Sequence, residues 1–194
     1  MVYLFIIGAG TLLFFLLKKY MKENGFSNEK TIDYVLLFFT LFFQILLYDK
    51  YGFQDKFFIY FLLILLLIQI SFIDMKQKII PNKLNILVAL IGFINILLNI
   101  KHGLNYFLAG FVAGGIFLFL ALITKGGIGG GDIKLFASLG MILGLYPTIL
   151  VIAYTFIFAS ILCIGLMIAK KATFTSTIAL APFINIATLY YLLT

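Results

Sequence analysis

Seven apolar stretches without a charged residue make up most of this chain, and the short segments between them carry the lysines and acids. A helix needs about 20 mostly apolar residues to cross a bilayer, so stretches of this length predict membrane-spanning helices. The chain is 64% hydrophobic, against roughly 45–50% in a soluble domain, so lipid must solvate much of its surface. The stretches are Val2–Leu17, Tyr34–Tyr48, Phe57–Ile73, Leu84–Ile100, Leu104–Thr124, Leu135–Ala169 and Thr177–Leu193.

The longest stretch, Leu135–Ala169, contains a turn signal. Its 35 residues are too many for one helix across about 30 Å of hydrocarbon. The segment Gly144-Leu145-Tyr146-Pro147 lies inside it, and a proline interrupts one helix but suits the first turn of the next. Division at this segment predicts an all-α integral membrane protein with about eight transmembrane helices.

The distribution of lysines predicts how these helices are oriented. With eight spans and the N-terminus outside, every lysine except Lys50, Lys56 and Lys101 falls in an inner loop, as the positive-inside bias requires. This bias also accounts for the net charge of +7, so we do not expect nucleic acid as a partner. The first stretch lacks the basic start and small-residue cleavage site of a signal peptide, and we expect it to be retained as a helix.

Two aspartates lie where apolar stretches meet the inner loops. Asp74 follows the third stretch and Asp132 precedes the sixth helix, so both are expected at the cytoplasmic face and at the same depth. Asp33 is expected on that side too, whereas Asp49 and Asp55 are expected outside. A carboxylate at the bilayer edge is costly to keep ionised and is a functional candidate by default. Either acid alone could simply balance nearby lysines, but their common depth favours a reacting pair.

Paired aspartates can hydrolyse a peptide bond. One ionised carboxylate takes a proton from water while a neutral one donates to the carbonyl, and adjacent carboxyl groups share a proton because both cannot easily ionise. Five of the six residues in Gly126–Gly131 are glycines, which permit positive φ and close approach of a substrate backbone. Asp132 is expected to begin or cap the next helix, whose N-terminal partial charge favours the ionised form and makes Asp132 the preferred base.

Other chemistries of glycine loops and metal-binding side chains fit the sequence poorly. A P-loop needs Lys and then Ser or Thr after its last glycine, where this chain has Asp132, and the dinucleotide pattern lacks its third glycine for the same reason. Cys163 is the only cysteine and His102 the only histidine, so neither a zinc site nor a disulfide framework is expected. We therefore predict no metal and no cofactor.

Polar and small residues inside the apolar stretches are expected to join helices. Asn95 and Asn99 lie four residues apart on one helix face, and hydrogen bonds between helices explain them more simply than substrate contacts do. Gly110, Gly114 and Gly115 likewise predict a face that packs closely against another helix.

Three segments resemble motifs of the type IV prepilin peptidases, a family of GxGD-type membrane aspartyl proteases. Segment 126–140, GGIGGGDIKLFASLG, resembles their second catalytic motif, and segment 74–82, DMKQKIIPN, resembles the first. Segment 178–183, IALAPF, is similar to the Pro-Phe segment before the family's last helix. Motif order and spacing agree over residues 1–194, which the resemblance identifies as a single membrane-embedded prepilin peptidase domain.

The resemblance implies an activity and a set of site residues. It implies an aspartic endopeptidase of the bacterial cytoplasmic membrane that removes the short basic leader of type IV prepilins or of the related pseudopilins of competence and type II secretion. Such precursors and the lipid bilayer are then the expected partners. Asp74 and Asp132 are the implied catalytic residues. The implied loop and substrate-binding residues are Gly126, Gly127, Gly129, Gly130, Gly131, Lys134, Pro81, Asn82, Pro182 and Phe183.

One segment departs from the family pattern. Many members carry, between their first two helices, a larger cytoplasmic segment with two CxxC pairs that is associated with N-methylation of the cleaved pilin. Here residues 18–33 are expected to form only a short cytoplasmic loop without cysteine, which argues against methyltransferase activity. Two alternatives to a peptidase stay open: a transporter or cation channel with membrane carboxylates, although no repeat symmetry is evident, and a non-catalytic pilus assembly factor.

Overall fold

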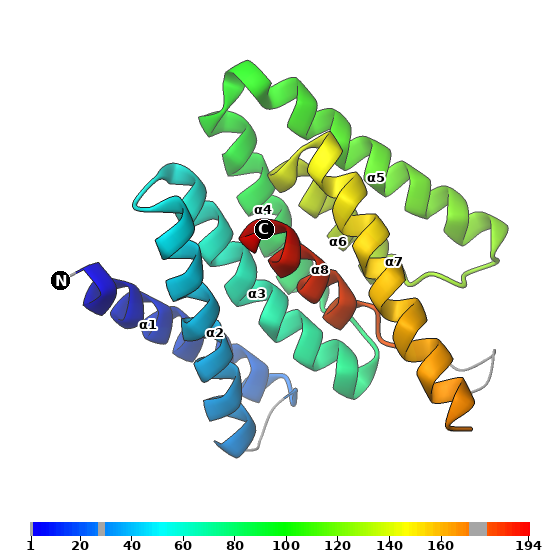
Figure 1. Ribbon diagram of the computed structural model, residues 1–194, viewed down its shortest axis with the longest axis horizontal. Coiled ribbons are helices and arrows are strands. Elements are labelled where there is room, and N and C mark those ends of the chain that lie inside the picture. The colour runs from blue at the N-terminus through cyan, green and yellow to red at the C-terminus, as the bar shows by residue number, and fades with distance from the viewer. Residues whose placement is uncertain (1, 27–29, 171–177) are drawn as a thin grey trace.

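The computed structural model describes residues 2–26, 30–170 and 178–194, and within these residues the chain is helical, without strands. The helices follow one another in alternating directions and pack side by side (Figure 1). They are α1 (Val2–Glu23), α2 (Lys30–Tyr51), α3 (Asp55–Gln77), α4 (Asn82–Leu98), the short 3-10 helix η1 (Ile100–His102), α5 (Gly103–Ile123), α6 (Gly130–Leu143), α7 (Leu145–Ile168) and α8 (Ala181–Leu193).

The predicted division of the longest apolar stretch is confirmed. α6 ends at Leu143 and α7 begins at Leu145. Gly144 between them has a φ of 86°, a conformation that residues with a Cβ rarely adopt. Pro147 lies in the first turn of α7, where its missing N–H leaves no helical hydrogen bond unmade.

Eight α-helices are found in the described residues, but only five of them are long and apolar enough to cross a membrane. These are α1, α2, α3, α5 together with η1, and α7. α4, α6 and α8 have 17, 14 and 13 residues, or about 26, 21 and 20 Å of helix, which is less than the roughly 30 Å of hydrocarbon. The last apolar stretch was expected to begin at Thr177, but α8 begins only at Ala181. Thr177 itself lies outside the described residues.

α3 lies at the centre of the helices (Figure 1). Its apolar window is 78% buried inside the protein, and it contacts α1, α2, α4 and α8. The helix is apolar on nearly every side, which is typical of an element enclosed by other helices. Asp74 belongs to the last turn of α3, so an enclosed and rigid element carries this carboxyl group.

α6 packs closely against α5 through small residues. A Cβ on Gly110 would lie 2.5 Å from the Met141 Cγ, and a Cβ on Gly114 would lie 3.0 Å from the Ala137 Cβ. Gly115 faces open space instead. The predicted packing face is therefore confirmed at Gly110 and Gly114 and is wrong at Gly115.

Asn95 joins α4 to the far end of α6. Its Nδ2 donates to the carbonyl oxygens of Met141 and Ile142, at 3.2 and 3.1 Å. These carbonyls lie in the last turn of α6, where the helix itself supplies no N–H partner. Asn99 donates to the Asn95 Oδ1 at 3.0 Å. The predicted bond between helices is confirmed for Asn95, whereas Asn99 supports it from within the same segment.

The connection between α1 and α2 is shorter than the predicted loop over residues 18–33. α1 continues to Glu23 and α2 begins at Lys30, because the lysine-rich end of the first apolar stretch remains helical. Lys18 Nζ and Asp33 Oδ2 form an ion pair of 2.9 Å between the two helices. Asp33 therefore helps to hold α1 against α2.

Candidate active site

Asp74 is a buried carboxyl group bound to the start of α8. The residue is only 5% exposed, and its Oδ2 accepts a hydrogen bond of 2.9 Å from the Ala181 N–H. The Leu180 N–H donates to the same carboxyl group. The first N–H groups of a helix have no partners within the helix and carry partial positive charge. Asp74 thus supplies the missing partner to α8 and is held in one orientation.

Ser71 reinforces this contact one turn earlier on α3. Its hydroxyl lies 2.6 Å from the Leu67 carbonyl oxygen and 3.2 Å from that of Ala181. The N–H of Ala181 therefore binds Asp74 while its carbonyl lies against Ser71. Two side chains of α3 hold the same residue of α8, although the residues are about a hundred positions apart in the sequence.

Asp132 is the third residue of α6 and closes the N-terminus of that helix. Its backbone N–H donates to the Gly129 carbonyl oxygen at 3.0 Å, and its carboxyl group accepts a hydrogen bond from the Gly129 N–H. Gly129 has no side chain, so only the half of a capping box in which the third residue of the helix binds the N-cap N–H is present. The prediction that Asp132 begins the following helix is confirmed.

The two carboxyl groups are close enough to interact electrostatically. The pKa of Asp132 is raised to about 6, first by burial and then by the negative charge of Asp74, while the hydrogen bond from Gly129 partly opposes both effects. Asp132 belongs to α6, which is not among the five helices of membrane-crossing length. A carboxyl pair in which one member keeps its proton to higher pH than an ordinary aspartate can act as acid and base together.

The glycine loop uses positive φ at its first glycine only. Gly126 has a φ of 89°, and Lys125 before it has a φ of 51°. The Gly126 N–H donates to the Ala121 carbonyl oxygen at 2.8 Å, which ends α5 in the manner of a Schellman motif. Gly129 is extended, with a φ of −67°. Of the glycines in this run, only Gly126 therefore uses the positive φ that glycine permits.

Gly131 is required for close packing instead. A Cβ on Gly131 would lie 2.8 Å from the Ile80 Cβ, a separation that real Cβ atoms do not reach without movement of the neighbour. The Gly131 carbonyl oxygen also accepts a hydrogen bond of 3.0 Å from the Asn85 Nδ2 of α4. The segment after Asp74 and the segment before Asp132 are thus in direct contact.

A second bond joins the same two segments. Lys134 Nζ donates to the Asn82 Oδ1 at 2.8 Å. Asn82 is the first residue of α4, and Pro81 before it is extended and forms the helix boundary. Hydrogen bonds therefore hold α4 against α6 at both ends, through Lys134 near Asp132 and through Asn95 at the far end. The structure brings together five of the predicted loop residues in this way: Pro81, Asn82, Gly129, Gly131 and Lys134.

The remaining predicted site residues lie around this centre. Gly126, Gly127 and Gly130 are exposed. Pro182 is the second residue of α8, next to the amide that binds Asp74, while Phe183 is buried at 9% exposure. Both residues therefore lie where α8 begins, at the helix end that binds Asp74. A contact of either residue with substrate stays a prediction.

Three residues that contact the site were not identified from the sequence. Ala181 and Leu180 act through backbone N–H groups, which leave no trace in side-chain chemistry. Asn85 had a usable signal, because it is a polar residue inside an apolar stretch and lies one helical turn after Asn82. Within residues 2–26, 30–170 and 178–194, no group of three or more His, Cys, Asp or Glu could hold a metal ion.

Comparison with known proteins agrees with the motifs. Residues 61–168, more than half of the chain, match Peptidase_A24, the type IV leader peptidase family. The chain belongs to this family. The matched residues include both Asp74 and Asp132, and the resemblance inferred from the motifs is confirmed.

A curated relative extends this comparison. The chain is 34% identical over 133 residues to the "Prepilin leader peptidase/N-methyltransferase" of Bacillus subtilis (strain 168). The alignment covers 67% of this chain and 50% of the relative, so the chain spans about half the length of the curated protein it matches. No solved structure matches the chain.

Proposed function

We propose that this protein is an aspartic endopeptidase that removes the short basic leader of type IV prepilins or pseudopilins at the cytoplasmic face of the bacterial membrane. The observation that carries the proposal is the meeting of Asp74 and Asp132 at neighbouring helix ends, with the pKa of Asp132 raised to about 6. Membership of the leader peptidase family supports the substrate class. The lysine-rich segments next to both acids support the cytoplasmic face.

The surroundings of the two acids support different roles for them. Backbone N–H groups of Ala181 and Leu180 bind the Asp74 carboxyl group, and such donors stabilise a carboxylate. Asp132 has one N–H donor, from Gly129, and retains its proton to higher pH. We therefore assign the base to Asp74 and the acid to Asp132, in place of the sequence-based preference for Asp132 as base.

The proposed reaction uses one water molecule and the shared proton. Asp74 takes a proton from the water as its oxygen attacks the scissile carbonyl carbon, while Asp132 donates a proton to the carbonyl oxygen. The C–N bond then breaks as the amine receives a proton from the pair. Gly127 and Gly130, in the loop that leads to Asp132, are exposed, so an extended substrate can approach the backbone of this loop.

Cleavage by the purified protein tests the proposal. The protein in detergent is mixed with candidate prepilins, and mass spectrometry identifies the new N-terminus. A single cut between the basic leader and the apolar segment is the expected result. Absence of cleavage together with Asp74-dependent cation flux in proteoliposomes would favour the transporter or channel alternative.

The rate of cleavage is expected to follow a bell-shaped dependence on pH. The base must be ionised, so activity falls at low pH, and the acid must keep its proton, so activity falls as pH rises past the pKa of Asp132, about 6. Bound substrate excludes more water from the acid, so the upper limb of kcat lies above this value, whereas kcat/KM reports the free enzyme. Values of kcat and kcat/KM, determined from initial rates across the pH range, check this. A profile with one limb only would contradict the assignment of a pair.

The cleaved product is expected to keep an unmethylated N-terminus. A methyl-donor pocket of a few hundred Å³ is lined by several elements, whereas the connection between α1 and α2 runs only from Glu23 to Lys30. Cys163 alone cannot build a zinc-bound scaffold. The measurement is mass spectrometry of the product formed with S-adenosylmethionine, with the Bacillus subtilis relative as positive control. An added mass of about 14 Da on the first residue would show that methylation is retained.

A further inference from the structure

A groove opens between α4 and α6 directly beside the two catalytic segments. Its cavity volume is about 480 Å³, and its walls include Asn82, Asn85 and Ala89 of α4 and Lys134, Ala137 and Met141 of α6. We call it the α4–α6 groove. These residues recur at helical spacing on one face of each helix, so the groove runs along both helices from the Asn82–Lys134 bond.

We infer that the α4–α6 groove binds the first turns of the apolar segment that follows the cleavage site in the substrate. The inference rests on the proposed peptidase function and names the part of the substrate that this surface holds. An apolar segment of a membrane-inserted precursor can reach the enzyme only from within the bilayer. A groove that starts at the catalytic loop and runs along the apolar helices α4 and α6 meets this requirement.

The groove is continuous with the catalytic loop. Lys134 follows Asp132 by two residues, and Asn85 holds the Gly131 carbonyl at 3.0 Å. From Asn82 to Ala89 the groove extends along seven residues of α4, which is about 10 Å or two helical turns. A peptide whose scissile bond lies at Asp132 therefore has its next residues within reach of the groove.

The chemistry of the walls fits an apolar segment. The hollow is present because Ala89 and Ala137 are small, and Ile86, which is 58% exposed, forms an apolar wall beside them. Asn85 also lines the groove, but its Nδ2 is bound to the Gly131 carbonyl oxygen and its Oδ1 is buried, so the exposed walls are mainly apolar.

The charge of Lys134 excludes the basic leader of the substrate from the groove. Lys134 stands at its polar end, bound to Asn82 at 2.8 Å. A basic leader is repelled by this ammonium group, whereas an uncharged segment is not. The groove therefore separates the two sides of the cleavage site, with the leader directed away from it.

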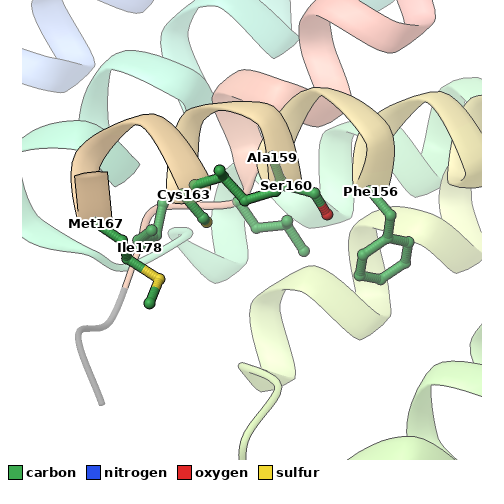
Figure 2. A pocket seen from close by; sticks show the side chains of 8 residues that line it. Phe156, Ala159, Ser160, Cys163, Met167 and Ile178 are labelled. Carbon is green, nitrogen blue, oxygen red and sulfur yellow. The ribbon is translucent and has the colours of Figure 1, made fainter. Parts of the chain in front are cut away.

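Two other hollows fit this role less well. Figure 2 shows the one beside α7, with Phe156, Cys163, Met167 and Ile178 on its walls. It ends at Ile178, next to residues outside the described part of the chain, and no charged residue lines it. The third hollow, between α1 and α3, includes Phe57, which lies 17 residues, or about 25 Å, before Asp74 along α3.

A substitution that fills the groove with a larger side chain tests the inference. In Ala89→Phe an aromatic ring occupies the hollow, and in the matched control Ala153→Phe the same change is made at an exposed alanine of α7. The probe is a synthetic precursor with a lysine-rich leader and about 20 apolar residues. We expect Ala89→Phe to raise KM and lower kcat/KM by about tenfold, the effect of losing roughly two buried methylene groups, with kcat little changed. Ala153→Phe should match the unsubstituted protein.

Cross-linking locates the bound segment independently of turnover. In a Cys163→Ser, Asp132→Asn background, a cysteine is placed at Ile86, in the groove, or at Leu87, which is exposed on α4 but does not line the groove. Each variant is oxidised with precursors that carry one cysteine in the apolar segment. We expect disulfide-linked complexes from Ile86→Cys with cysteines near the cleavage site and none from Leu87→Cys.

The outcomes separate this inference from the proposed function. If the unsubstituted protein cleaves no precursor, the peptidase function itself fails. If it cleaves and both aspartates are required, but Ala89→Phe retains its KM or Ile86→Cys forms no cross-link, the groove assignment is wrong. Loss of a co-purified phospholipid from Ala89→Phe, seen by native mass spectrometry with KM unchanged, would assign the groove to lipid instead.

Discussion

Asp74→Asn and Asp132→Asn are each expected to lower cleavage by roughly 10³-fold or more, because a positioned proton donor or acceptor contributes about 10²–10⁴-fold and neither amide can exchange the proton that the pair shares. The double variant should be little worse than either single one, since residues that act as a unit lose their effect together. Cleavage rates of the purified variants on one precursor measure both effects.

The fold should survive these substitutions. An asparagine at position 74 still offers an oxygen to the Ala181 N–H, which now binds the Asp74 Oδ2 at 2.9 Å, so α8 keeps its partner. Asp55→Asn is the matched control, because Asp55 is an exposed residue in the first turn of the same helix. We expect it to cleave normally. Thermal unfolding in detergent should be similar for all variants, and a single variant that retained more than about a tenth of the activity would refute the pair.

Gly131→Val is expected to have the next largest effect, a loss of about 100-fold in activity. The added Cβ would lie 2.8 Å from the Ile80 Cβ, so the two catalytic segments must move apart. A displacement of about 1 Å in a reacting group is enough to cost this factor. The hydrogen bond between Asn85 and the Gly131 carbonyl should weaken at the same time. Single-turnover cleavage measures the loss, which should fall on kcat.

Gly115→Val separates this effect from the general cost of valine in a helix. Gly115 lies in α5, and a Cβ added there would have no atom of another residue within 4 Å beyond its own helix neighbours, so the same substitution meets no obstacle. We expect normal cleavage by Gly115→Val. Equal activity in Gly131→Val and Gly115→Val would mean that the contact with Ile80 does not position Asp132.

The physical reason why position 131 needs glycine lies in packing rather than in backbone conformation. The sequence indicated that the glycine run permits positive φ and close approach, and only Gly126 of the run adopts positive φ, with a value of 89°. A run of glycines shows that side chains are excluded, but it does not say whether backbone conformation or a neighbour excludes them. The neighbour at Gly131 is Ile80, about fifty residues earlier, and no local pattern connects the two.

Local patterns were sufficient for the helices and for the pairing of the acids. Apolar runs, lysines and the turn at Gly144 predicted eight helices, because hydropathy and helix breaking depend on residues close together in the sequence. Alternating helix directions then placed Asp74 and Asp132 at corresponding ends. The number of membrane-crossing helices was overestimated, because α4, α6 and α8 are apolar but too short to be counted among the spans. Hydropathy reports that a residue avoids water but not whether lipid or protein surrounds it.

Only the tertiary structure shows how the two acids are held. The sequence alone favoured Asp132 as the ionised base, from its place at a helix start. The packed helices show Asp74 at the start of α8, bound to an amide 107 residues away, and a half-buried Asp132 whose pKa is raised to about 6 by burial and by the charge of Asp74. Burial, the field of a neighbouring carboxylate and the amides of a distant helix set these properties. All three arise from contacts between segments far apart in the chain, which become fixed only when the helices pack.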